Sequence, residues 1–348
     1  MRRNGYDSYH GRRRGRTVLL ILITALLIIL MLSLAALFFL EPYIHYSSDG
    51  VRIDLPPLFQ KTEDDNPPDS TAPLQFTTPT PDPSATATPE AETQTTFRGV
   101  ELSLSDLTGG TAQTQAESAG AAAAIFALKD TDGELAYQSQ QSFAQEYDLN
   151  AADGAVNQAI QQANGGELYT VAYLSCFRDD ILPQWNRSLS VHSSGGNYWD
   201  DEGVRWTSPA SAEVRQYVTG LCQEAAALGF DELLLDNCGF PTRGNLDSIK
   251  GDSNYNSANL TADMTTFFQQ LETALAGYPE LKVSVVTSLS VLNGTSDGSG
   301  LTLDLLKQYA DRVFVAVPDG QTLPTIEGLE IVPIVAQGTG EGSWAVLR

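Results

Sequence analysis

The sequence predicts a (β/α)8 TIM-like barrel, preceded by one transmembrane helix and a disordered linker. From Phe97 onward, short apolar runs typical of strands alternate with longer amphipathic stretches typical of helices. This alternation indicates parallel strands joined by right-handed crossovers. Roughly 250 residues are enough for the eight units of a TIM barrel. The alternative is a doubly wound open sheet, but no Gly-x-Gly-x-x-Gly turn follows any of the predicted strands.

The N-terminal residues predict attachment to a membrane. Residues 17–40 contain no charged side chain, and about 20 such residues span the hydrocarbon core of a bilayer. The segment stays apolar beyond Ala35 and Ala36, which favours an uncleaved signal anchor over a cleaved signal peptide. Residues 1–16 carry six arginines and form the expected cytoplasmic tail, so that the rest of the chain would be extracytoplasmic. Residues 41–60 would then be a juxtamembrane segment.

Residues 61–96 differ in composition from the rest of the chain. They are rich in Pro, Thr, Asp and Ser and poor in aromatic residues. Such a segment buries too little apolar surface to offset the entropy of ordering, so we expect an extended, disordered linker. The linker would hold a barrel domain, residues 97–348, away from the membrane surface.

Eight strands and four helices are predicted in the barrel domain. The strands are expected over Arg98–Leu104, Ala122–Lys129, Leu168–Cys176, Glu232–Asn237, Leu281–Leu289, Arg312–Val317, Glu330–Ala336 and Ser343–Leu347. The helices are expected over Ala152–Asn164, Ser211–Leu228, Ala258–Ala276 and Leu301–Ala310. Only eleven residues follow Gln337, so the last helix should be missing and a bare strand around Trp344 should close the barrel.

The charge of the chain excludes one class of partner. Asp and Glu number 43 against 20 Lys and Arg, which gives a formal net charge of −23. So acidic a chain repels phosphate backbones, and we expect no nucleic-acid partner. The three cysteines, Cys176, Cys222 and Cys238, show no metal-ligand spacing, and no metal or cofactor is expected. Cys176 and Cys238 could meet on neighbouring strands, but the sequence leaves the pairing of the three open.

The stretch GFDELLLDNCGFP, from Gly229 to Pro241, places an aspartate at the end of a buried strand. Side chains alternate along a barrel strand between the lumen and the surrounding helices. If Asp236 faces the lumen, so do Leu234 and Glu232, and Asp236 is the last inward residue. Barrel enzymes build their active sites at the carboxyl ends of the strands, so Asp236 is the first catalytic candidate. The alternative is an Asp236 that caps the following loop or pairs with a neighbouring charge.

The segment from Arg205 to Pro241 resembles that of a known family. It keeps a Trp-x-x-Pro motif, a helix with Val-x-x-Tyr and Glu-Ala, and then Gly-Phe-Asp-Glu, an aspartate and Phe-Pro. This pattern is similar to that of the glycoside hydrolases of the DUF4015 type, and weaker similarities extend over most of residues 97–340. The resemblance implies a TIM-like barrel related to amylase-like glycosidases. It also implies that Asp236 occupies the position of their nucleophile on the fourth strand.

Several polar positions of the family pattern are changed in this chain. Ala127 stands where the family has an aspartate, Tyr173 where it has an arginine, and Ser208 where it has an aspartate before Pro209. Gly239 replaces the arginine of the family's Asp-Tyr-x-Arg-Phe-Pro. These changes leave two interpretations open: an active glycosidase, or a barrel that has lost catalysis.

Glycoside hydrolysis needs a second carboxyl group near Asp236. Asp130 and Asp179 follow the second and third predicted strands and keep the family positions, so they are the preferred catalytic partners. Further acids that follow predicted strands are Asp132, Asp180, Asp200, Asp201, Glu202 and Asp319. Asp132 precedes a glycine and is expected in a turn. Lys129 is expected to form an ion pair at a strand end.

Sugar binding also needs flat aromatic side chains. The expected substrate-binding residues are Trp199, Trp206, Tyr198, Tyr173, Asn237 and Gln337. The first three lie in one long loop, residues 182–210, together with Trp185. Aromatic residues in such a loop can stack on sugar rings or pack into a small core of the loop itself, and the sequence favours neither.

These observations predict a membrane-anchored, extracytoplasmic glycoside hydrolase that acts on a polysaccharide of the cell envelope or of the environment. Its partners would be a glycan and, through residues 17–40, the membrane. The main alternative is a catalytically degenerate barrel that serves as a glycan- or protein-binding module of the envelope. A purely structural surface protein is a third possibility.

Overall fold

The structure is a computed structural model that describes residues 44–47, 50–53, 96–318, 321–338 and 340–347. The predicted cytoplasmic tail, the membrane span and, except for residue 96, the linker lie outside the described residues. Among the residues that are described, no helix is long and apolar enough to cross a membrane. The chain divides into two units, Met1–Thr88 and Pro89–Arg348. In the first unit, β1 (Ile44–Ser47) and β2 (Gly50–Ile53) pair antiparallel.

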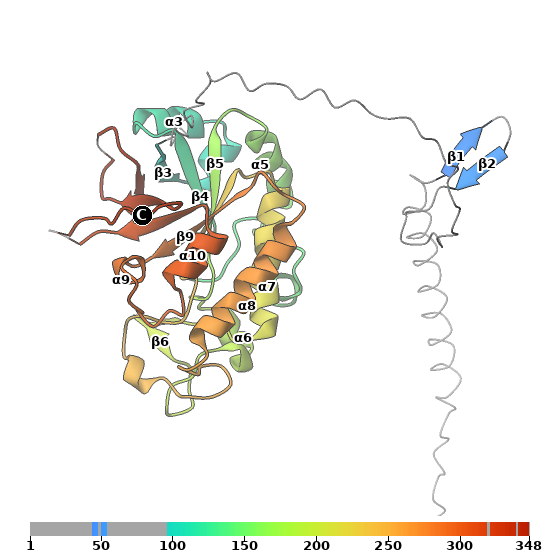
Figure 1. Ribbon diagram of the computed structural model, residues 1–348. Helices are drawn as coiled ribbons and strands as arrows, with labels where there is room; N and C mark the ends of the chain where they lie inside the picture. Colours follow the sequence, from blue (N-terminus) through green and yellow to red (C-terminus); the bar gives the residue numbers. More distant parts are fainter. Residues whose placement is uncertain (1–43, 48–49, 54–95, 319–320, 339, 348) are drawn as a thin grey trace, which may run out of the picture. The chain divides into compact units, whose positions relative to one another are not determined.

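The second unit is a closed barrel of eight parallel strands (Figure 1). The strands are β3 (Arg98–Leu102), β4 (Ala123–Lys129), β5 (Tyr169–Ser175), β8 (Glu232–Asp236), β9 (Lys282–Thr287), β10 (Arg312–Ala316), β11 (Glu330–Ile334) and β12 (Trp344–Val346). They follow one another around the barrel in chain order, and β12 pairs with β3 to close it. Each predicted strand coincides with an observed one, which confirms the barrel and excludes the open sheet.

Helices cover the barrel over the first five units only. They are α2 (Leu104–Thr108), α3 (Ala112–Ser118), α4 (Ser142–Glu146), α5 (Val156–Asn164), α6 (Leu182–Trp185), α7 (Ala212–Ala227), α8 (Leu260–Leu275), α9 (Leu289–Leu292) and α10 (Leu303–Tyr309). In the described residues after β10, no helix joins the strands and none follows β12. Among the described residues, the connections from β10 to β11 and from β11 to β12 thus lack helices.

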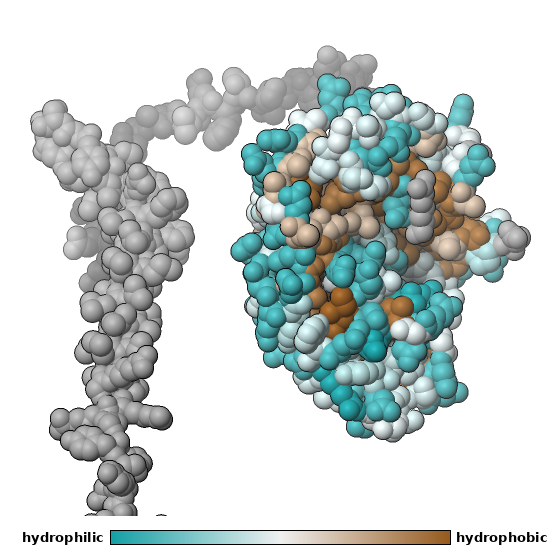
Figure 2. All heavy atoms as spheres, turned by 180° about the vertical axis from the view of Figure 1, so that it is seen from behind, coloured by the Kyte–Doolittle hydropathy of each residue, from teal (hydrophilic) through white to brown (hydrophobic). Residues whose placement is uncertain are grey.

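Helix α7 shows why these elements form where they do. Ser211 caps its first turn by accepting a hydrogen bond from the backbone N–H of Val214 at 3.4 Å. Apolar residues at helical spacing, among them Tyr217 and Leu221, are buried against the barrel. Helices α7 and α8 lie side by side along one flank of the barrel (Figure 1). Seen from behind, the barrel unit is largely hydrophilic at its surface, with hydrophobic residues visible between the polar ones (Figure 2).

Alternation along β8 places Asp236 at the mouth of the barrel. Leu234 belongs to the small apolar cluster that fills the lumen with Phe97, Ala123, Ile125, Val171, Phe314, Val332 and Ala345. Leu233 and Leu235 belong to the larger cluster between the strands and the helices. Because side chains alternate in a strand, Glu232 and Asp236 share the lumen face with Leu234. The predicted orientation of this strand is thus confirmed.

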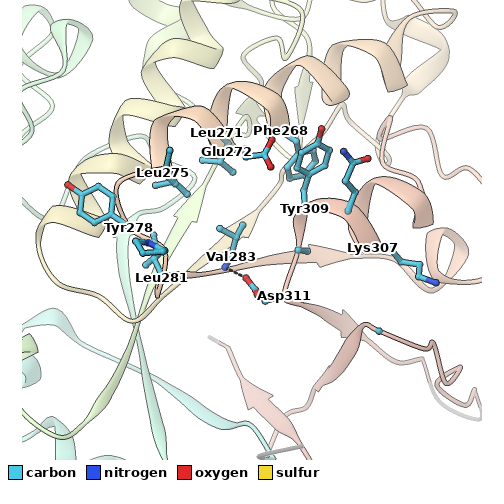
Figure 3. A pocket seen from close by; sticks show the side chains of 15 residues that line it. Phe268, Leu271, Glu272, Leu275, Tyr278, Leu281, Val283, Lys307, Tyr309 and Asp311 are labelled. Carbon is cyan, nitrogen blue, oxygen red and sulfur yellow. Dashed lines mark hydrogen bonds between the residues drawn. The ribbon is translucent and has the colours of Figure 1, made fainter. Parts of the chain in front are cut away.

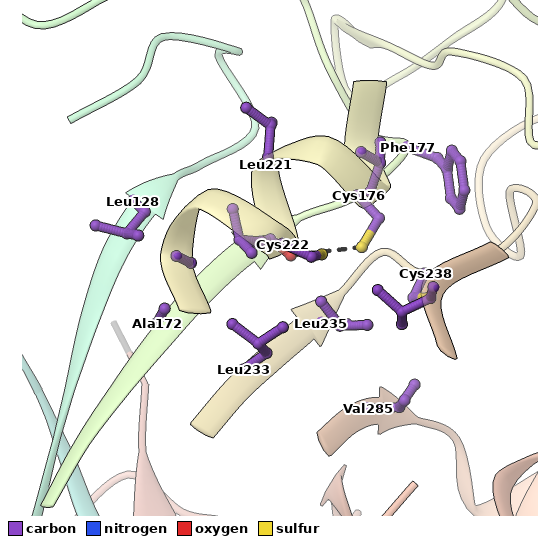
Figure 4. Close-up of a cluster of buried hydrophobic side chains, with 14 of the residues drawn as sticks. Leu128, Ala172, Cys176, Phe177, Leu221, Cys222, Leu233, Leu235, Cys238 and Val285 are labelled. Atoms are coloured by element: carbon purple, nitrogen blue, oxygen red, sulfur yellow. Dashed lines mark hydrogen bonds between the residues drawn. The ribbon is translucent and has the colours of Figure 1, made fainter. Parts of the chain in front are cut away.

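The three cysteines lie in the apolar layer around the barrel (Figure 4). Cys222 projects from α7, whereas Cys176 and Cys238 follow the carboxyl ends of β5 and β8. All three are buried and free. Burial, followed by the proximity of Cys176, raises the pKa values of Cys222 and Cys238 well above the ordinary value, so these two side chains are neutral thiols that pack as apolar groups.

Buried polar side chains link five strands at the floor of the barrel. Glu232 is completely buried and accepts hydrogen bonds from Tyr169 on β5, at 2.8 Å, and from Ser284 on β9. Arg312 on β10 approaches Glu232 and Glu330 of β11, at 3.5 Å each. Such networks are stable only when each buried polar group has partners. This floor cluster lies at the opposite end of β8 from Asp236.

Candidate active site

A cavity of about 690 Å³ opens at the carboxyl ends of the strands. It is lined by Glu101, Ala127, Asp130, Thr131, Asp132, Tyr173, Arg178, Asp236, Asn237, Arg243, Val286 and Leu347. These residues come from β3, β4, β5, β8 and β9 and from the segments that follow these strands and β12. TIM-barrel enzymes place their active sites at this end. We call this space the mouth cavity.

Asp236 is held in a fixed orientation in the mouth cavity. Its Oδ2 accepts a hydrogen bond of 2.7 Å from the hydroxyl of Tyr173. Its Oδ1 accepts one of 2.6 Å from the backbone N–H of Asn237. Asn237 has a φ of 47°, which asparagine tolerates better than most residues, and its side chain donates to Ser175 Oγ at 3.1 Å. The turn after β8 is thus built to orient this carboxylate.

Tyr173 is the hydrogen-bond donor that this carboxylate requires. Burial, followed by the charges of Asp236 and Glu101, raises the pKa of Tyr173 far above its ordinary value. The hydroxyl therefore stays protonated and donates a hydrogen bond to Asp236. Glu101 of β3 lines the same cavity and is a carboxyl group that the sequence analysis missed. Alternation from Gly99 along the first strand would have placed it on the lumen face.

Asp130 and Asp132 lie on the wall of the mouth cavity after β4. Asp130 Oδ1 accepts from the backbone N–H of Asp132 at 3.2 Å, and Asp132 Oδ1 accepts from that of Glu134 at 3.0 Å. Asp132 precedes Gly133, whose φ is 95°, so it does occupy a turn as predicted. Burial, then a hydrogen bond with the Asp130 carboxyl group, raises the pKa of Asp132. Asp132 therefore binds a proton more readily than an isolated aspartate.

Asp179, in contrast, is not brought to the mouth cavity. It is 1% exposed, and its Oδ2 lies 3.0 Å from the ammonium group of Lys129. Its Oδ1 accepts hydrogen bonds from the backbone N–H groups of Ile181 and Leu182, at 3.0 and 2.9 Å. The ion pair predicted for Lys129 is confirmed, but its partner is the aspartate that was expected to be catalytic. The chain turns after β5 so that Asp179 points at β4 instead of the lumen.

The long loop forms a small core instead of an aromatic wall. Trp199 is 2% exposed, and its indole N–H donates to the carbonyl oxygen of Asn245 at 3.0 Å. Tyr198 lies between the guanidinium groups of Arg187 and Arg205, at 5.8 and 5.2 Å from its ring centre. Neither aromatic residue lines the mouth cavity. The loop forms the hairpin of β6 (Asp200–Asp201) and β7 (Val204–Arg205) and packs around these aromatic residues, outside the mouth cavity.

A smaller cavity of about 230 Å³ adjoins the first. Asp236, Asn237 and Arg243 line both, and Trp206 lines only the smaller one. Asp297 also lines it, and its carboxylate accepts three hydrogen bonds from Ser288 and Ser299, at 2.6 to 2.9 Å. Gln337 is exposed and lines neither cavity. Trp206 and Asn237 thus stay substrate-binding candidates, whereas Gln337 does not.

Three of the family's altered positions, Ala127, Tyr173 and Gly239, line the two cavities at the mouth, whereas Ser208 is buried and lines neither. Ala127 and Tyr173 are direct partners across β4 and β5, so the aspartate and the arginine of the family pattern are lost as a pair. Gly239 has no room for an arginine, since a Cβ atom there would lie 2.7 Å from the carbonyl oxygen of Ser299. Positive charge is provided instead by Arg178 and Arg243, which line the mouth cavity.

Another hollow, of about 530 Å³, lies outside the barrel between α8 and α10 (Figure 3). Phe268, Leu271 and Tyr309 form much of its apolar wall. Asp311 lies at its base and accepts a hydrogen bond of 2.8 Å from the backbone N–H of Val283. This hollow is near the amino ends of β9 and β10, far from the mouth. In the part of the chain that is described, no group of three His, Cys, Asp or Glu side chains could hold a metal ion.

Comparison with known families identifies the barrel. Residues 114–312 match the model of DUF4015, which is described as "Putative glycosyl hydrolase domain". The match covers more than half of the chain. The chain belongs to the DUF4015 family. The matched DUF4015 segment begins in α3 and ends at β10, so it contains Asp130, Tyr173 and Asp236.

Solved structures with a similar fold are distant in sequence. A hypothetical protein from Ruminiclostridium thermocellum is 21% identical with a TM-score of 0.44, and the match covers 53% of this chain and 96% of that one. An α-galactosidase from Thermus thermophilus is 13% identical with a TM-score of 0.38, covering 63% and 41%. The glycoside hydrolase domain of PelA from Pseudomonas aeruginosa is 15% identical with a TM-score of 0.40, covering 69% and 83%. The DUF4015 chain thus spans about two fifths of the length of that galactosidase. A comparison with curated proteins gives no match.

Proposed function

We propose that this DUF4015 protein is a membrane-anchored, extracytoplasmic glycoside hydrolase that cleaves a polysaccharide in the mouth cavity. The observation that carries the proposal is the meeting of Asp236 with the Asp130–Asp132 pair in one cavity at the carboxyl ends of the strands. Two carboxyl groups on either side of a glycosidic bond are the minimum for its hydrolysis. The apolar residues 17–40 and the arginines before them support the anchored, extracytoplasmic location.

The two carboxyl groups would have different tasks. Asp236, oriented by Tyr173 and its own backbone, would attack the anomeric carbon and form a glycosyl ester. The Asp130–Asp132 pair would give its proton to the glycosidic oxygen, so that the leaving sugar departs as a neutral alcohol. Water would then attack the ester, return a proton to the pair and release the second sugar with Asp236 free again. The pKa of Asp132 is shifted upward, which is the direction that a general acid requires.

The test is a hydrolysis screen of the full chain against envelope and plant polysaccharides, with Asp236→Asn as the matched control for contaminating activity. We expect new reducing ends with the wild type only. On the polysaccharide that is cleaved, Asp132→Asn should lower kcat by about 10² or more. On an aryl glycoside whose leaving group needs no proton, the kcat/KM of Asp132→Asn, which reports only the formation of the glycosyl ester, should stay close to that of the wild type. An equal loss on both substrates would show that Asp132 is not the acid.

One observation favours a second candidate, a barrel that binds glycans without cleaving them. Ala127 and Tyr173 replace an aspartate and an arginine of the DUF4015 pattern at the centre of the mouth. In that case the wild type and Asp236→Asn would both bind a polysaccharide, and neither would release reducing ends from it.

A further inference from the structure

Trp185 is an unusually exposed tryptophan. It is 63% exposed, whereas Trp199, Trp206 and Trp344 are 2 to 4% exposed. It ends α6, in the loop that follows β5, and so lies toward the mouth end of the barrel without lining either mouth cavity. Large aromatic side chains are usually buried at least in part, because their exposure to water is unfavourable. An indole left this open is a candidate contact for a ligand.

The exposed indole is the outer ring of a three-ring stack, whose inner ring meets a fourth ring at an angle of 57°. The ring of Tyr147 lies 5.7 Å from that of Trp185 and is parallel to it within 5°. Phe143 stacks on the inner side of this pair, 5.8 Å from Tyr147, and meets Tyr217 at 5.5 Å. Tyr217 is 3% exposed and belongs to the core of α7. The stack thus runs from the core to the surface and fixes the plane of the indole.

A fixed ring is a better binding platform than a mobile one. A side chain that already holds its bound conformation loses little rotamer entropy when a ligand arrives. One face of the Trp185 indole is covered by Tyr147, and its high exposure leaves the other face to solvent. Glu146 and Asn186 lie beside the Tyr147 hydroxyl, and both influence its pKa. A flat apolar face is therefore bordered by groups that bind hydroxyls.

The size of this surface favours a sugar ring over a protein. In the described part of the chain, Leu246 is the only other large hydrophobic residue that is exposed, at 36%. A stable protein interface buries about 800 Å² on each partner, which a single indole does not offer. One pyranose ring, in contrast, covers about one indole face with its C–H groups. Glu146 and Glu213 beside Tyr147 and the net charge of −23 disfavour an anionic glycan.

We propose that Trp185 and Tyr147 form a second carbohydrate site, outside the mouth cavity, that stacks on a pyranose ring of an uncharged polysaccharide. This site rests on the proposed function in one respect, since it would hold the polymer that the mouth cleaves. It would raise the affinity for long chains and leave the cleavage of short substrates unchanged.

The test is affinity electrophoresis of the full chain through gels that contain amylose, laminarin or hydroxyethyl cellulose, three uncharged glucans. We expect at least one glucan to retard the wild type, and Trp185→Ala to bind it roughly three- to tenfold more weakly. Trp185→Tyr, which keeps a flat ring, should recover part of the loss. Asp236→Asn should be retarded like the wild type, because the mouth carboxylate does not contribute to this site.

Fluorescence gives an independent measurement. Because three of the four tryptophans are buried, quenching by acrylamide should report mainly on Trp185. The retarding glucan should protect this fluorescence, and Trp185→Phe should abolish the protected fraction. Equal retardation of the wild type and Trp185→Ala, or no protection by any of the three glucans, would overturn the proposal. If neither the wild type nor Asp236→Asn cleaves a glucan that is bound through Trp185, the hydrolase proposal is contradicted, whereas the proposed carbohydrate site at Trp185 is supported.

Discussion

Asp179 and Asp236 lie at the carboxyl ends of neighbouring strands, but their side chains have different partners and different access to solvent. Asp236 accepts from a neutral hydroxyl and a backbone amide and faces a cavity. Asp179 faces the Lys129 ammonium group in the interior and also fixes the start of α6 by accepting from Ile181 and Leu182. A buried ion pair is costly to break from one side, because the remaining charge is left without its partner. We therefore assign Asp179 to the stability of the barrel, whereas Asp236 stays the proposed catalytic carboxylate.

Asp179→Asn should lower the free energy of unfolding by about 3 kcal/mol, because it leaves the Lys129 charge buried without its partner. Activity measured well below the unfolding temperature should be unchanged. Asp180→Asn is a matched control: Asp180 pairs with Arg205 at 2.6 Å, but both side chains are about 30% exposed. Asp180→Asn should lower the free energy of unfolding by less than about 1 kcal/mol. Urea unfolding and kcat of both variants check this, and a stable but inactive Asp179→Asn would contradict it.

At the scale of elements, strand β8 carries a structural and a functional carboxyl group on one face. Glu232 begins the strand at the floor and Asp236 ends it at the mouth, roughly 13 Å away at about 3.3 Å per residue. Packed apolar side chains of the lumen cluster separate the two ends. The floor cluster connects β5, β8, β9, β10 and β11, and so joins two strands that no helix follows in the described residues, β10 and β11, to three strands that helices do follow.

The floor cluster should make stability depend on pH in a defined direction. Burial raises the pKa of Glu232 more than Arg312, Ser284 and Tyr169 lower it. The folded protein therefore binds this proton more tightly than the unfolded chain. The resulting stabilisation is complete below the unfolded pKa and is lost as pH rises through the folded pKa.

Glu232→Gln removes this titration. Urea unfolding between pH 4 and pH 8 should show the wild type gaining stability relative to Glu232→Gln as the pH falls. Glu330→Gln, which removes one charge from the same cluster, is the control for a general effect of charge. A stability difference between the wild type and Glu232→Gln that grows as the pH rises would contradict the burial of Glu232 as the dominant effect.

At the scale of the whole molecule, periodicity predicted the barrel because each strand is a short apolar run between polar segments. Helices α2, α3, α4, α6 and α9 were not predicted, because four to seven residues are too few to show a clear helical period. The bare strand β12 was predicted from the short C-terminus, and it closes the barrel by pairing with β3 over Trp344–Val346.

Of the candidate site, the sequence could predict only the side chains within strands, because strand alternation shows which of them face the lumen. Asp236 follows directly from the pattern of β8, and Glu101 could have been found in the same way. Asp179 and Trp199 could not, because their burial depends on Lys129 and Asn245, which are distant in the sequence. A position at the end of a strand indicates the mouth, but the conformation of the following loop decides where the side chain points.

The central claim is that Asp236 is the carboxylate that attacks the substrate, and the most direct measurement is the ratio of kcat between the wild type and Asp236→Asn on a polysaccharide that the full chain binds. Asparagine keeps the size of the side chain and can still hydrogen-bond to Tyr173. We expect kcat to fall by at least about a thousandfold, with the Kd for the same polysaccharide changed by less than about threefold. Equal kcat values for the two chains, or release of no reducing ends by the wild type from any polysaccharide it binds, would contradict the claim.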